Sequence, residues 1–507
     1  MSTPKFESQR AAVLRRLVET NAVERLWAKD HTLFQPEPAE CANRFGWLDE
    51  PTAALAEAAE LLQYAASLVA AGVTDVVWCG MGGSSLFPAL INNAPLPRQD
   101  GLRLDVIDTS HPAAIARSLA NHDPKQTLYV FASKSGGTIE TRCQLDTFAE
   151  HCSEGRFAVI TDSGSALDEI ATERGWTAWH ANPDVGGRYS ALSRFGTIAT
   201  ALTGIDPSLI ASAALRMSDE CRADRDNPGL ELSAFLCAAH NMGRDKLTLI
   251  TPPALDGFGA WAEQLAAEST GKHGVGITVV ADEPIGPPTV YGDDRCFVTY
   301  GDFNGIADLR DAGHPVLDLG PISIAALGAE LMRWMLATAW IGAVLRINPF
   351  DQPDVEAAKS GTLAALASGA VITEHQPSDV DALFGTGRDD DQIVIQAFID
   401  PESSDVAELQ ELRIRLRDKY LCAVTIGIGP RYLHSTGQLH KGGPNTGLFL
   451  QILDAGTDDV AIPGRDFGFA ALLTAQANGD FAALKQAGRR VVRVSMSTAL
   501  ALPHEGR

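Results

Sequence analysis

The sequence predicts an α/β protein made of doubly wound parallel sheets, with a further α/β segment at its C-terminal end. Three observations support this prediction. Short apolar runs typical of buried strands alternate with helix-like stretches along most of the chain. Two glycine- and hydroxyl-rich stretches each follow such a run and precede a helix-like stretch. At 507 residues the chain is too long for one ordinary core, so we expect two or three α/β units.

The pattern of apolar residues divides the chain into four parts. The expected parts are an N-terminal helical segment (1–70), a first doubly wound domain (71–210), a second one (211–385) and a C-terminal α/β segment (386–507). Within the first part, apolar positions recur with helical spacing in 11–18 and 53–71. Strands are expected at 75–79, 104–108, 128–132, 157–161, 247–251, 276–280, 296–299, 315–319, 393–398, 422–426, 447–452 and 491–494. A long apolar helix is expected at about 322–346.

The stretches Gly-Met-Gly-Gly-Ser-Ser at 80–85 and Ser-Lys-Ser-Gly-Gly-Thr at 133–138 are typical of two walls of one phosphate site. Both would emerge at the carboxyl edge of a parallel sheet, where ligands bind. Glycine lets the backbone approach an anion closely, and the N–H groups that begin the following helix point at its oxygens. Either stretch alone is also compatible with a tight turn, but the two together favour a phosphate site.

A nicotinamide-binding fold is the nearest alternative, because Gly80-x-Gly82 partly matches the dinucleotide fingerprint and Asp108 ends the next strand. Ser85 replaces the third glycine of that fingerprint, and the fingerprint does not predict the stretch at 133–138. A P-loop is excluded, because no Gly-x-x-x-x-Gly-Lys-Ser/Thr occurs in the sequence.

The composition argues against several classes of protein. A formal net charge of −23, without clusters of lysine and arginine, argues against nucleic-acid binding. No apolar run reaches the roughly 18 to 20 residues of a membrane span, and the polar start is unlike a signal peptide, so we expect a cytoplasmic protein without membrane association. The eight cysteines show neither a Cys-x-x-Cys nor the spacing of a zinc site, so we expect most of them to be reduced core residues.

Several polar residues could take part in proton transfer or charge stabilisation. Gln264 and Glu268 are four residues apart, so on a helix they share one face. Arg188 follows two glycines, and an arginine beside a reacting sugar would stabilise negative charge on oxygen. His434 lies near a glycine-rich loop and could exchange a proton near neutral pH. A solvated glutamate and an ion-paired arginine are the structural alternatives, and His434 and His440 make a poor metal pair.

Taken together, these stretches resemble the glucose-6-phosphate isomerase family, in particular the form that is commonly fused behind a transaldolase. No transaldolase portion precedes them here, so we expect a free-standing isomerase. The resemblance covers nearly the whole chain, through segments at 26–33, 80–85, 133–138, 186–190, 268–272, 283–286, 291–295, 348–359, 434–443 and 475–480.

The resemblance implies two sugar-isomerase (SIS-like) domains, homodimers with active sites near the subunit interface, and no metal or organic cofactor. It also implies roles for individual residues. The sugar phosphate would contact Gly83, Ser84, Ser133, Lys134, Ser135 and Thr138. Arg188 would flank the reacting carbons, Gln264 and Gln352 would line the site, and Glu268 would be the base. Lys359 and His434 would assist ring opening, with His273 as the alternative histidine.

The function implied is the reversible conversion of D-glucose 6-phosphate to D-fructose 6-phosphate through an enediol, in glycolysis and gluconeogenesis. One feature departs from many members of the family, in which the ring-opening histidine precedes the lysine, whereas His434 follows Lys359. Two alternatives stay open: a sensor that binds a sugar phosphate without catalysis, and an isomerase of a mannose, amino-sugar or sulfo-sugar analogue.

Overall fold

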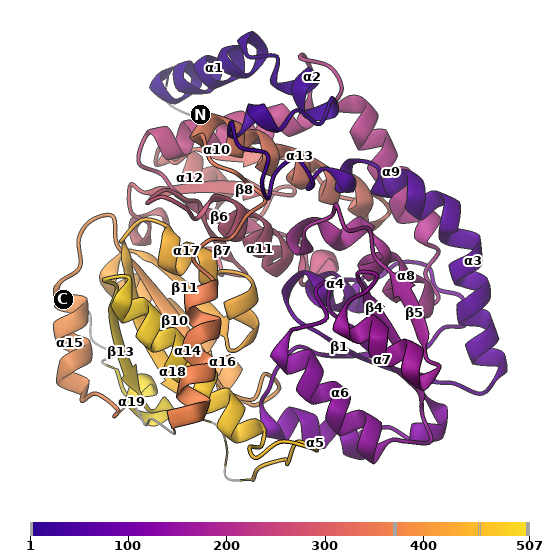
Figure 1. The fold of residues 1–507 in the computed structure, drawn as a ribbon. Coiled ribbons are helices and arrows are strands. Elements are labelled where there is room, and N and C mark those ends of the chain that lie inside the picture. Colours follow the sequence, from indigo (N-terminus) through magenta and orange to yellow (C-terminus); the bar gives the residue numbers. More distant parts are fainter. Residues whose placement is uncertain (1–3, 369–372, 455, 457, 503–507) are drawn as a thin grey trace.

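The computed structural model describes residues 4–368, 373–454, 456 and 458–502, and the side chains of 356–359 and 368 lie outside the described part. The backbone forms three parallel β-sheets, each built from its own stretch of the chain and flanked by helices (Figure 1). The predicted α/β fold with doubly wound parallel sheets is therefore confirmed.

The first sheet has five parallel strands in the order β2-β1-β3-β4-β5. Its strands are β1 (Asp75–Gly80), β2 (Arg103–Ile107), β3 (Thr127–Ala132), β4 (Arg156–Thr161) and β5 (Thr177–His180). Every residue of β1 and β3 is buried, as expected for central strands covered on both faces. The sequence prediction omits β5, because this short edge strand is partly exposed and lacks an apolar run.

The second and third sheets have four parallel strands each, in the orders β7-β6-β8-β9 and β11-β10-β12-β13. The strands of the second sheet are β6 (Lys246–Ile250), β7 (Thr278–Ala281), β8 (Arg295–Thr299) and β9 (Val316–Asp318). Those of the third sheet are β10 (Gln392–Phe398), β11 (Ala423–Ile428), β12 (Gly447–Leu453) and β13 (Arg490–Val494). Each strand expected in these regions overlaps an observed one.

The N-terminal helices lie over the other units rather than forming a separate bundle. They are α1 (Pro4–Glu19), α2 (Ala22–Trp27) and α3 (Glu50–Ala70). The helix α1 packs on α10 (Pro228–Asn241), whereas α3 packs on α8 (Arg194–Leu202) and α9 (Pro207–Glu220), as Figure 1 shows.

The remaining helices connect the strands of the three sheets. The first sheet is connected by α4 (Leu86–Asn93), α5 (Pro112–Asn121), α6 (Ile139–His151) and α7 (Ala166–Arg174). Around the second sheet lie α11 (Phe258–Thr270), α12 (Ile306–Asp311) and α13 (Leu327–Leu345). The next two helices, α14 (Glu356–Ser368) and α15 (Pro377–Gly385), pack on the third unit. The third sheet has α16 (Asp405–Tyr420), α17 (Gly437–Gly442), α18 (Phe469–Gln486) and α19 (Met496–Leu500). Although α14 follows the second unit in sequence, it packs on α18 of the third.

The long helix α13 is the apolar helix expected at about 322–346. Among the described residues, Ile324–Leu345 is the one segment that by length and composition could cross a membrane. It is not a continuous apolar run, because it contains Glu330 and Arg333. In the folded protein, 72% of the most apolar part of this helix is buried, as is typical of a core helix.

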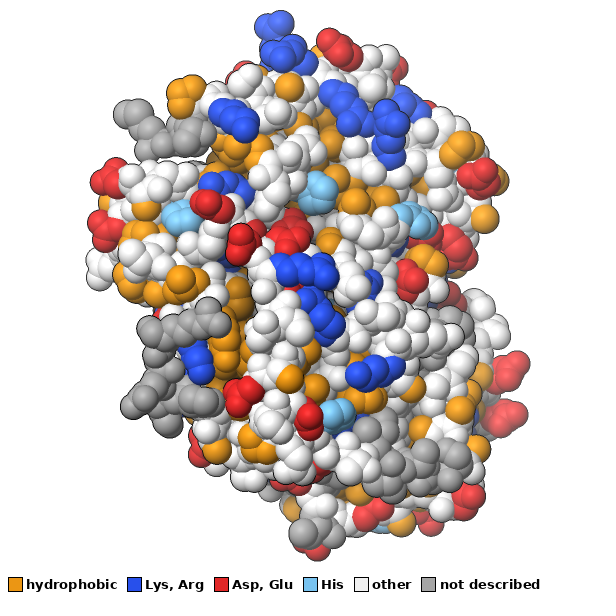
Figure 2. All heavy atoms as spheres, turned by 90° about the vertical axis from the view of Figure 1, so that its left-hand side faces the viewer, with side chains coloured by type: hydrophobic (Ala, Val, Ile, Leu, Met, Phe, Trp, Pro, Cys, Tyr) orange, Lys and Arg blue, Asp and Glu red, His pale blue; other side chains and the backbone are white. Residues whose placement is uncertain are grey.

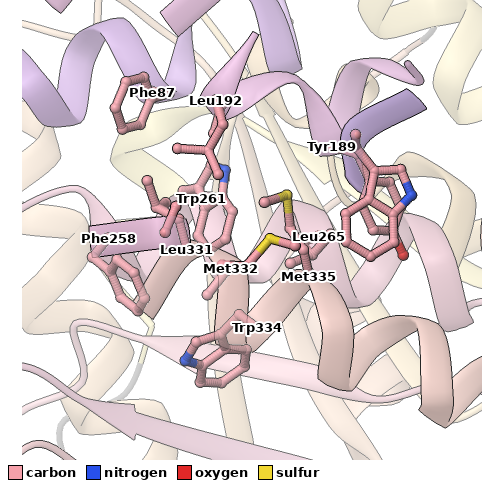
Figure 3. Packing of buried hydrophobic residues seen from close by; sticks show 14 of the residues in the cluster. Phe87, Tyr189, Leu192, Phe258, Trp261, Leu265, Leu331, Met332, Trp334 and Met335 are labelled. Carbon is pink, nitrogen blue, oxygen red and sulfur yellow. The ribbon is translucent and has the colours of Figure 1, made fainter. Parts of the chain in front are cut away.

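One apolar cluster joins the first two units (Figure 3). Phe87 of α4 and Leu192 of the first unit pack with Trp261 of α11. On the other side of Trp261, Leu331 and Met335 of α13 complete the cluster. Buried large side chains lose several kcal/mol when they are truncated, so this packing fixes the position of α11 against the first unit.

The surface carries charges of both signs. On the face that Figure 2 shows, Lys and Arg side chains stand among Asp and Glu side chains and do not form one continuous band. The whole sequence has 64 Asp and Glu against 41 Lys and Arg, and on this face the two signs are mixed (Figure 2).

Two short 3₁₀ turns of the first unit lie directly against each other. The turn η3 (Gly82–Ser84) follows β1, and η5 (Gly187–Leu192) precedes α8. Ser190 Oγ donates a hydrogen bond of 3.0 Å to the carbonyl oxygen of Gly83. A Cβ atom at Gly83 would lie only 1.9 Å from the carbonyl oxygen of Gly187. The two backbones can approach this closely only because residue 83 has no side chain.

We predict that Gly83→Ala lowers the free energy of unfolding by about 1–3 kcal/mol, because the added methyl group forces the two turns apart. Gly186→Ala is the matched control, because a Cβ there would meet nothing within 4 Å. That control should change stability by less than about 0.5 kcal/mol. Urea unfolding of both variants measures the difference, and equal losses would contradict the proposed clash.

Candidate active site

Three separate stretches of the chain meet where the first two units join. Arg188 comes from η5 of the first unit, and Glu268 comes from the last turn of α11 in the second. The loop at 348–352, which follows α13, supplies hydrogen-bond acceptors to Arg188. The predicted residues Arg188, Gln264, Glu268 and Gln352 are thus brought together from positions far apart in the sequence.

The centre of this cluster is an ion pair between Arg188 and Glu268. Arg188 Nη2 lies 3.0 Å from Glu268 Oε1. The arginine side chain is 3% exposed and the glutamate side chain 15% exposed. Glu268 therefore stays accessible from one side while a permanent positive charge stands on the other.

The guanidinium of Arg188 is held in one orientation by the loop at 348–352. Its Nη1 donates to the carbonyl oxygens of Pro349 at 2.9 Å and Asp351 at 3.1 Å. Its Nη2 donates to Oε1 of Gln352. Because these acceptors surround the planar fork, the edge that faces Glu268 is fixed.

Gln264 lies one helical turn before Glu268 on the same face of α11, as their spacing of four predicts. Its Nε2 donates to Glu268 Oε2 at 3.2 Å and to the carbonyl oxygen of His434 at 2.7 Å. This amide therefore links the carboxylate in the second unit to the histidine loop of the third.

His434 ends the short turn η9 (Arg431–His434) and pairs with Glu140 of α6, whose side chain is 3% exposed. Their Nε2 and Oε1 atoms are 2.8 Å apart. Gln476 Nε2 donates to the same oxygen at 2.6 Å, and Ser110 Oγ donates to Gln476 Oε1 at 2.5 Å. Burial raises the pKa of Glu140, but His434 and these hydrogen bonds outweigh it and hold the pKa below its usual value.

Glu140 and Ser110 are site residues that no sequence pattern singled out, and Gln476 was included only as part of the resembling segment at 475–480. Glu140 lies two residues after Thr138, directly behind the second hydroxyl-rich stretch, and this position was the only available signal. Because an ionised carboxylate only accepts hydrogen bonds, Nε2 of His434 must carry a proton in this arrangement.

A pocket of about 340 Å³ opens beside this pair, between the first and third units. Ser135 and Thr138 line it, together with His434 and Leu363. Ser133 is buried beneath, and its hydroxyl lies 2.9 Å from that of Thr138. Because Thr138 is the residue before α6, the positive end of that helix dipole is close to these hydroxyls.

The first glycine-rich stretch, at 80–85, packs against the backbone of His434. Gly82 has a φ of +54°, and a Cβ there would lie 2.4 Å from the carbonyl oxygen of His434. Among the described residues, neither Ser84 nor Lys134 lines the pocket. Ser84 is buried, and its carbonyl oxygen accepts a 2.7 Å hydrogen bond from Trp78. Lys134 pairs instead with Asp162, at 2.6 Å.

For two further predicted residues the structure describes no contact with the cluster. The side chain of Lys359 lies outside the described residues, and its backbone belongs to α14, which also carries Thr362 and Leu363 of the pocket wall. His273, the alternative histidine, is exposed in a turn with a φ of +54°.

The lysine before this turn, Lys272, is fully buried and binds the loop at 348–352. Its Nζ lies 2.8 Å from Asp351 Oδ1 and donates to the carbonyl oxygen of Asn348. Burial, with Arg188 close by, lowers the pKa of Lys272 to about 7.

The cluster combines a partly exposed carboxylate, a permanent cation beside it, and a histidine held by a second carboxylate. These groups suit proton transfer at a carbon whose neighbouring oxygen gains negative charge. Within the described part of the chain, no group of three or more His, Cys, Asp and Glu side chains has the arrangement of a metal site.

Comparisons with known proteins point to one family. The sequence pattern described as phosphoglucose isomerase matches residues 63–287. A glucose-6-phosphate isomerase of Rubrobacter xylanophilus is 28% identical over 363 residues, which cover 58% of this chain and 83% of the relative. One of Parasynechococcus marenigrum is 30% identical over 378 residues, which cover 62% of this chain and 68% of the relative.

A solved structure supports the same fold. The crystal structure of a glucose-6-phosphate isomerase from Chlamydia trachomatis matches with a TM-score of 0.59 and 19% identity, covering 71% of this chain and 86% of that one. The sequence relatives and the shared fold lead to one conclusion: this chain belongs to the phosphoglucose isomerase family.

Proposed function

We propose that this protein is a glucose-6-phosphate isomerase, which interconverts D-glucose 6-phosphate and D-fructose 6-phosphate through an enediol. The observation that carries this proposal is the ion pair between Arg188 and Glu268, 3.0 Å apart. Gln264 links this pair to His434, which lines a pocket together with Ser135 and Thr138. An aldose and a ketose are exchanged by moving one proton between adjacent carbons, and a single accessible carboxylate can make both transfers.

We assign the base to Glu268 and the stabilising cation to Arg188. The carboxylate takes the proton from one carbon and returns it to the next, while oxygen of the substrate carries negative charge in between. Arginine stays charged at any working pH, so it can stabilise that oxygen without competing for the proton. Gln264 and Gln352, which bind Glu268 and Arg188 respectively, would keep both groups in position.

We assign the sugar phosphate to the hydroxyl-lined pocket. Ser135 and Thr138 line it, and Ser133 supports Thr138 through their 2.9 Å contact. Backbone groups around Gly83, Ser84 and Lys134 would add donors. The positive end of α6 favours an anion there even though the ammonium of Lys134 is engaged by Asp162.

We assign ring opening to His434, held by Glu140, with Lys359 as its helper. A proton on Nε2 of His434 is shared with Glu140 at 2.8 Å, so the imidazole is fixed in one orientation. This arrangement supports a histidine that exchanges a proton with the ring oxygen or its neighbouring hydroxyl. The sensor alternative would leave Glu268, Glu140 and His434 without a role.

We further propose a cytoplasmic homodimer that serves glycolysis and gluconeogenesis, with active sites near the subunit interface. We also propose a kinship with the family members that are fused behind a transaldolase, because the resemblance implies that in them, too, the histidine follows the lysine, as His434 follows Lys359 here.

The proposed reaction is tested by incubating the protein with fructose 6-phosphate in heavy water. An enediol intermediate exchanges its proton with solvent through the base, so deuterium should enter C2 of the glucose 6-phosphate formed. Product without deuterium would contradict an exchanging enediol, and no product would contradict the isomerase. A parallel incubation with mannose 6-phosphate separates the glucose enzyme from an isomerase of the related sugar.

We predict that Glu268→Gln lowers kcat about 10²- to 10⁴-fold and changes KM little, because it removes the base and keeps the shape of the side chain. Glu263→Gln on the same helix is the matched control. Burial raises the pKa of Glu263 to about 8, so its carboxyl is largely protonated at neutral pH and an amide replaces it closely. Steady-state kinetics of both variants decide the point, and near-normal turnover in Glu268→Gln would rule out this residue as the base.

We predict that the double variant Ser133→Ala/Thr138→Ala mainly raises KM, by about 10-fold or more, because two donors to the phosphate are lost at roughly 1 kcal/mol each. Thr141→Ala, a buried threonine in the first turn of α6, is the control for general damage to this helix. A fall in kcat at unchanged KM would contradict the phosphate assignment.

A further inference from the structure

Lys272 is unusual because its charged side chain is fully removed from solvent. Its side chain is 0% exposed, and it is one of two cations in the cluster, the other being Arg188. Removing an ammonium group from water costs several kcal/mol unless good partners replace the water. Because Lys272 has no exposed surface, it cannot touch a substrate, so any effect on the reaction must pass through its protein partners.

Those partners are Asn348 and Asp351, which belong to the loop at 348–352 that binds Arg188. Lys272 binds the carbonyl oxygen of Asn348 and the carboxylate of Asp351. The carbonyl oxygens that receive Arg188 Nη1 belong to Pro349 and Asp351, which lie between and at these two anchor points. The anchor therefore determines where the acceptors of Arg188 stand.

Asn348 makes two further hydrogen bonds that hold the loop at 348–352 in place. Asn348 Nδ2 donates to the carbonyl oxygen of Glu40 at 3.0 Å, and Asn348 Oδ1 accepts from the backbone N–H of Phe350 at 3.0 Å. Lys272 supplies the only described ion pair to this segment, since Asp351 pairs with no other cation among the described residues.

We propose that Lys272 is a positioning residue, which through Asp351 and Asn348 fixes the loop at 348–352 and thereby aims Arg188 at the base Glu268. The proposal deepens the proposed function and rests on it for its kinetic arm. Lys272 lies only four residues after Glu268, so the segment that presents the base also anchors the cation opposite it. A shift of the loop would change the 3.0 Å separation of Arg188 and Glu268 without removing either group.

The kinetic test compares Lys272→Met in the wild-type and Arg188→Ala backgrounds. In the wild type we expect kcat to fall about 10- to 100-fold with a change in KM of less than about 3-fold, because misplacing a stabilising group acts on the transition state. In the Arg188→Ala background the same substitution should lower kcat less than about 3-fold, because coupled residues are not additive. Equal losses in both backgrounds would overturn the proposal.

Lys246→Met is the matched control for burying a methionine in place of a lysine. Lys246 is 1% exposed and pairs with Asp245 at 2.6 Å at the start of β6. It should keep kcat within about 2-fold of the wild type. A loss as large as that of Lys272→Met would mean that any buried lysine of this unit has the same effect, and would overturn the proposal.

Asp351→Asn removes the other partner of the same ion pair, and the Asp351 side chain is partly exposed. This variant replaces Lys272→Met in the test if Lys272→Met does not fold. It should show the same fall in kcat and the same dependence on Arg188. A normal kcat in Asp351→Asn would overturn the anchor.

A readout independent of activity separates this proposal from the proposed function. Amide hydrogen exchange of a peptide spanning 346–353 should be at least about 10-fold faster in Lys272→Met than in the wild type, and unchanged in Lys246→Met. If the wild type isomerised no sugar, the proposed function would be wrong. Faster amide exchange in Lys272→Met would still establish that Lys272 anchors the loop at 348–352. Unchanged exchange in Lys272→Met would sink the anchor, whatever the enzyme does.

Discussion

The close approach of Arg188 and Glu268 is the constraint on which the rest of the site depends. A guanidinium and a carboxylate that are largely removed from water cost free energy unless their remaining atoms find partners. Here Pro349, Asp351 and Gln352 complete the hydrogen bonds of the arginine, while Gln264 reaches the second oxygen of the glutamate. The pair therefore requires three stretches of chain to be in place at once, and a fault in any of them would leave a charge without its partner.

Packing supplies that alignment from both sides. Trp261 lies seven residues before Glu268 on α11 and is buried against Phe87 and Leu192 (Figure 3). This apolar cluster therefore fixes the position of the helix that carries the proposed base. On the first unit, η5 carries Arg188 and rests on η3 through the bare backbone of Gly83. The pair that we propose as catalytic is consequently a product of contacts between units, and neither unit could present it alone.

The sequence predicted the parts of this arrangement that periodicity and local composition encode. Continuous apolar runs marked β1 and β3, and the spacing of four placed Gln264 and Glu268 on one face. It missed the exposed strand β5, which has no apolar run. Glu140 and Lys272 were passed over because their value lies in partners 294 and 79 residues away, His434 and Asp351. Carbonyl acceptors such as that of Pro349 leave no trace in the side-chain pattern at all.

A chain with a net charge of −23 must bind an anionic sugar by short-range effects. Among the described side chains, three cations near the site are already engaged: Arg188 by Glu268, Lys272 by Asp351 and Lys134 by Asp162. The described lining of the pocket offers instead the hydroxyls of Ser135 and Thr138 at the start of α6. Neutral donors and a helix end act within a few ångströms, whereas surface carboxylates are screened over about 8 to 10 Å. Glu140, the carboxylate among the described lining residues of the pocket, is paired with His434. The charge that would repel a phosphate is therefore balanced by the residue that we assign to ring opening.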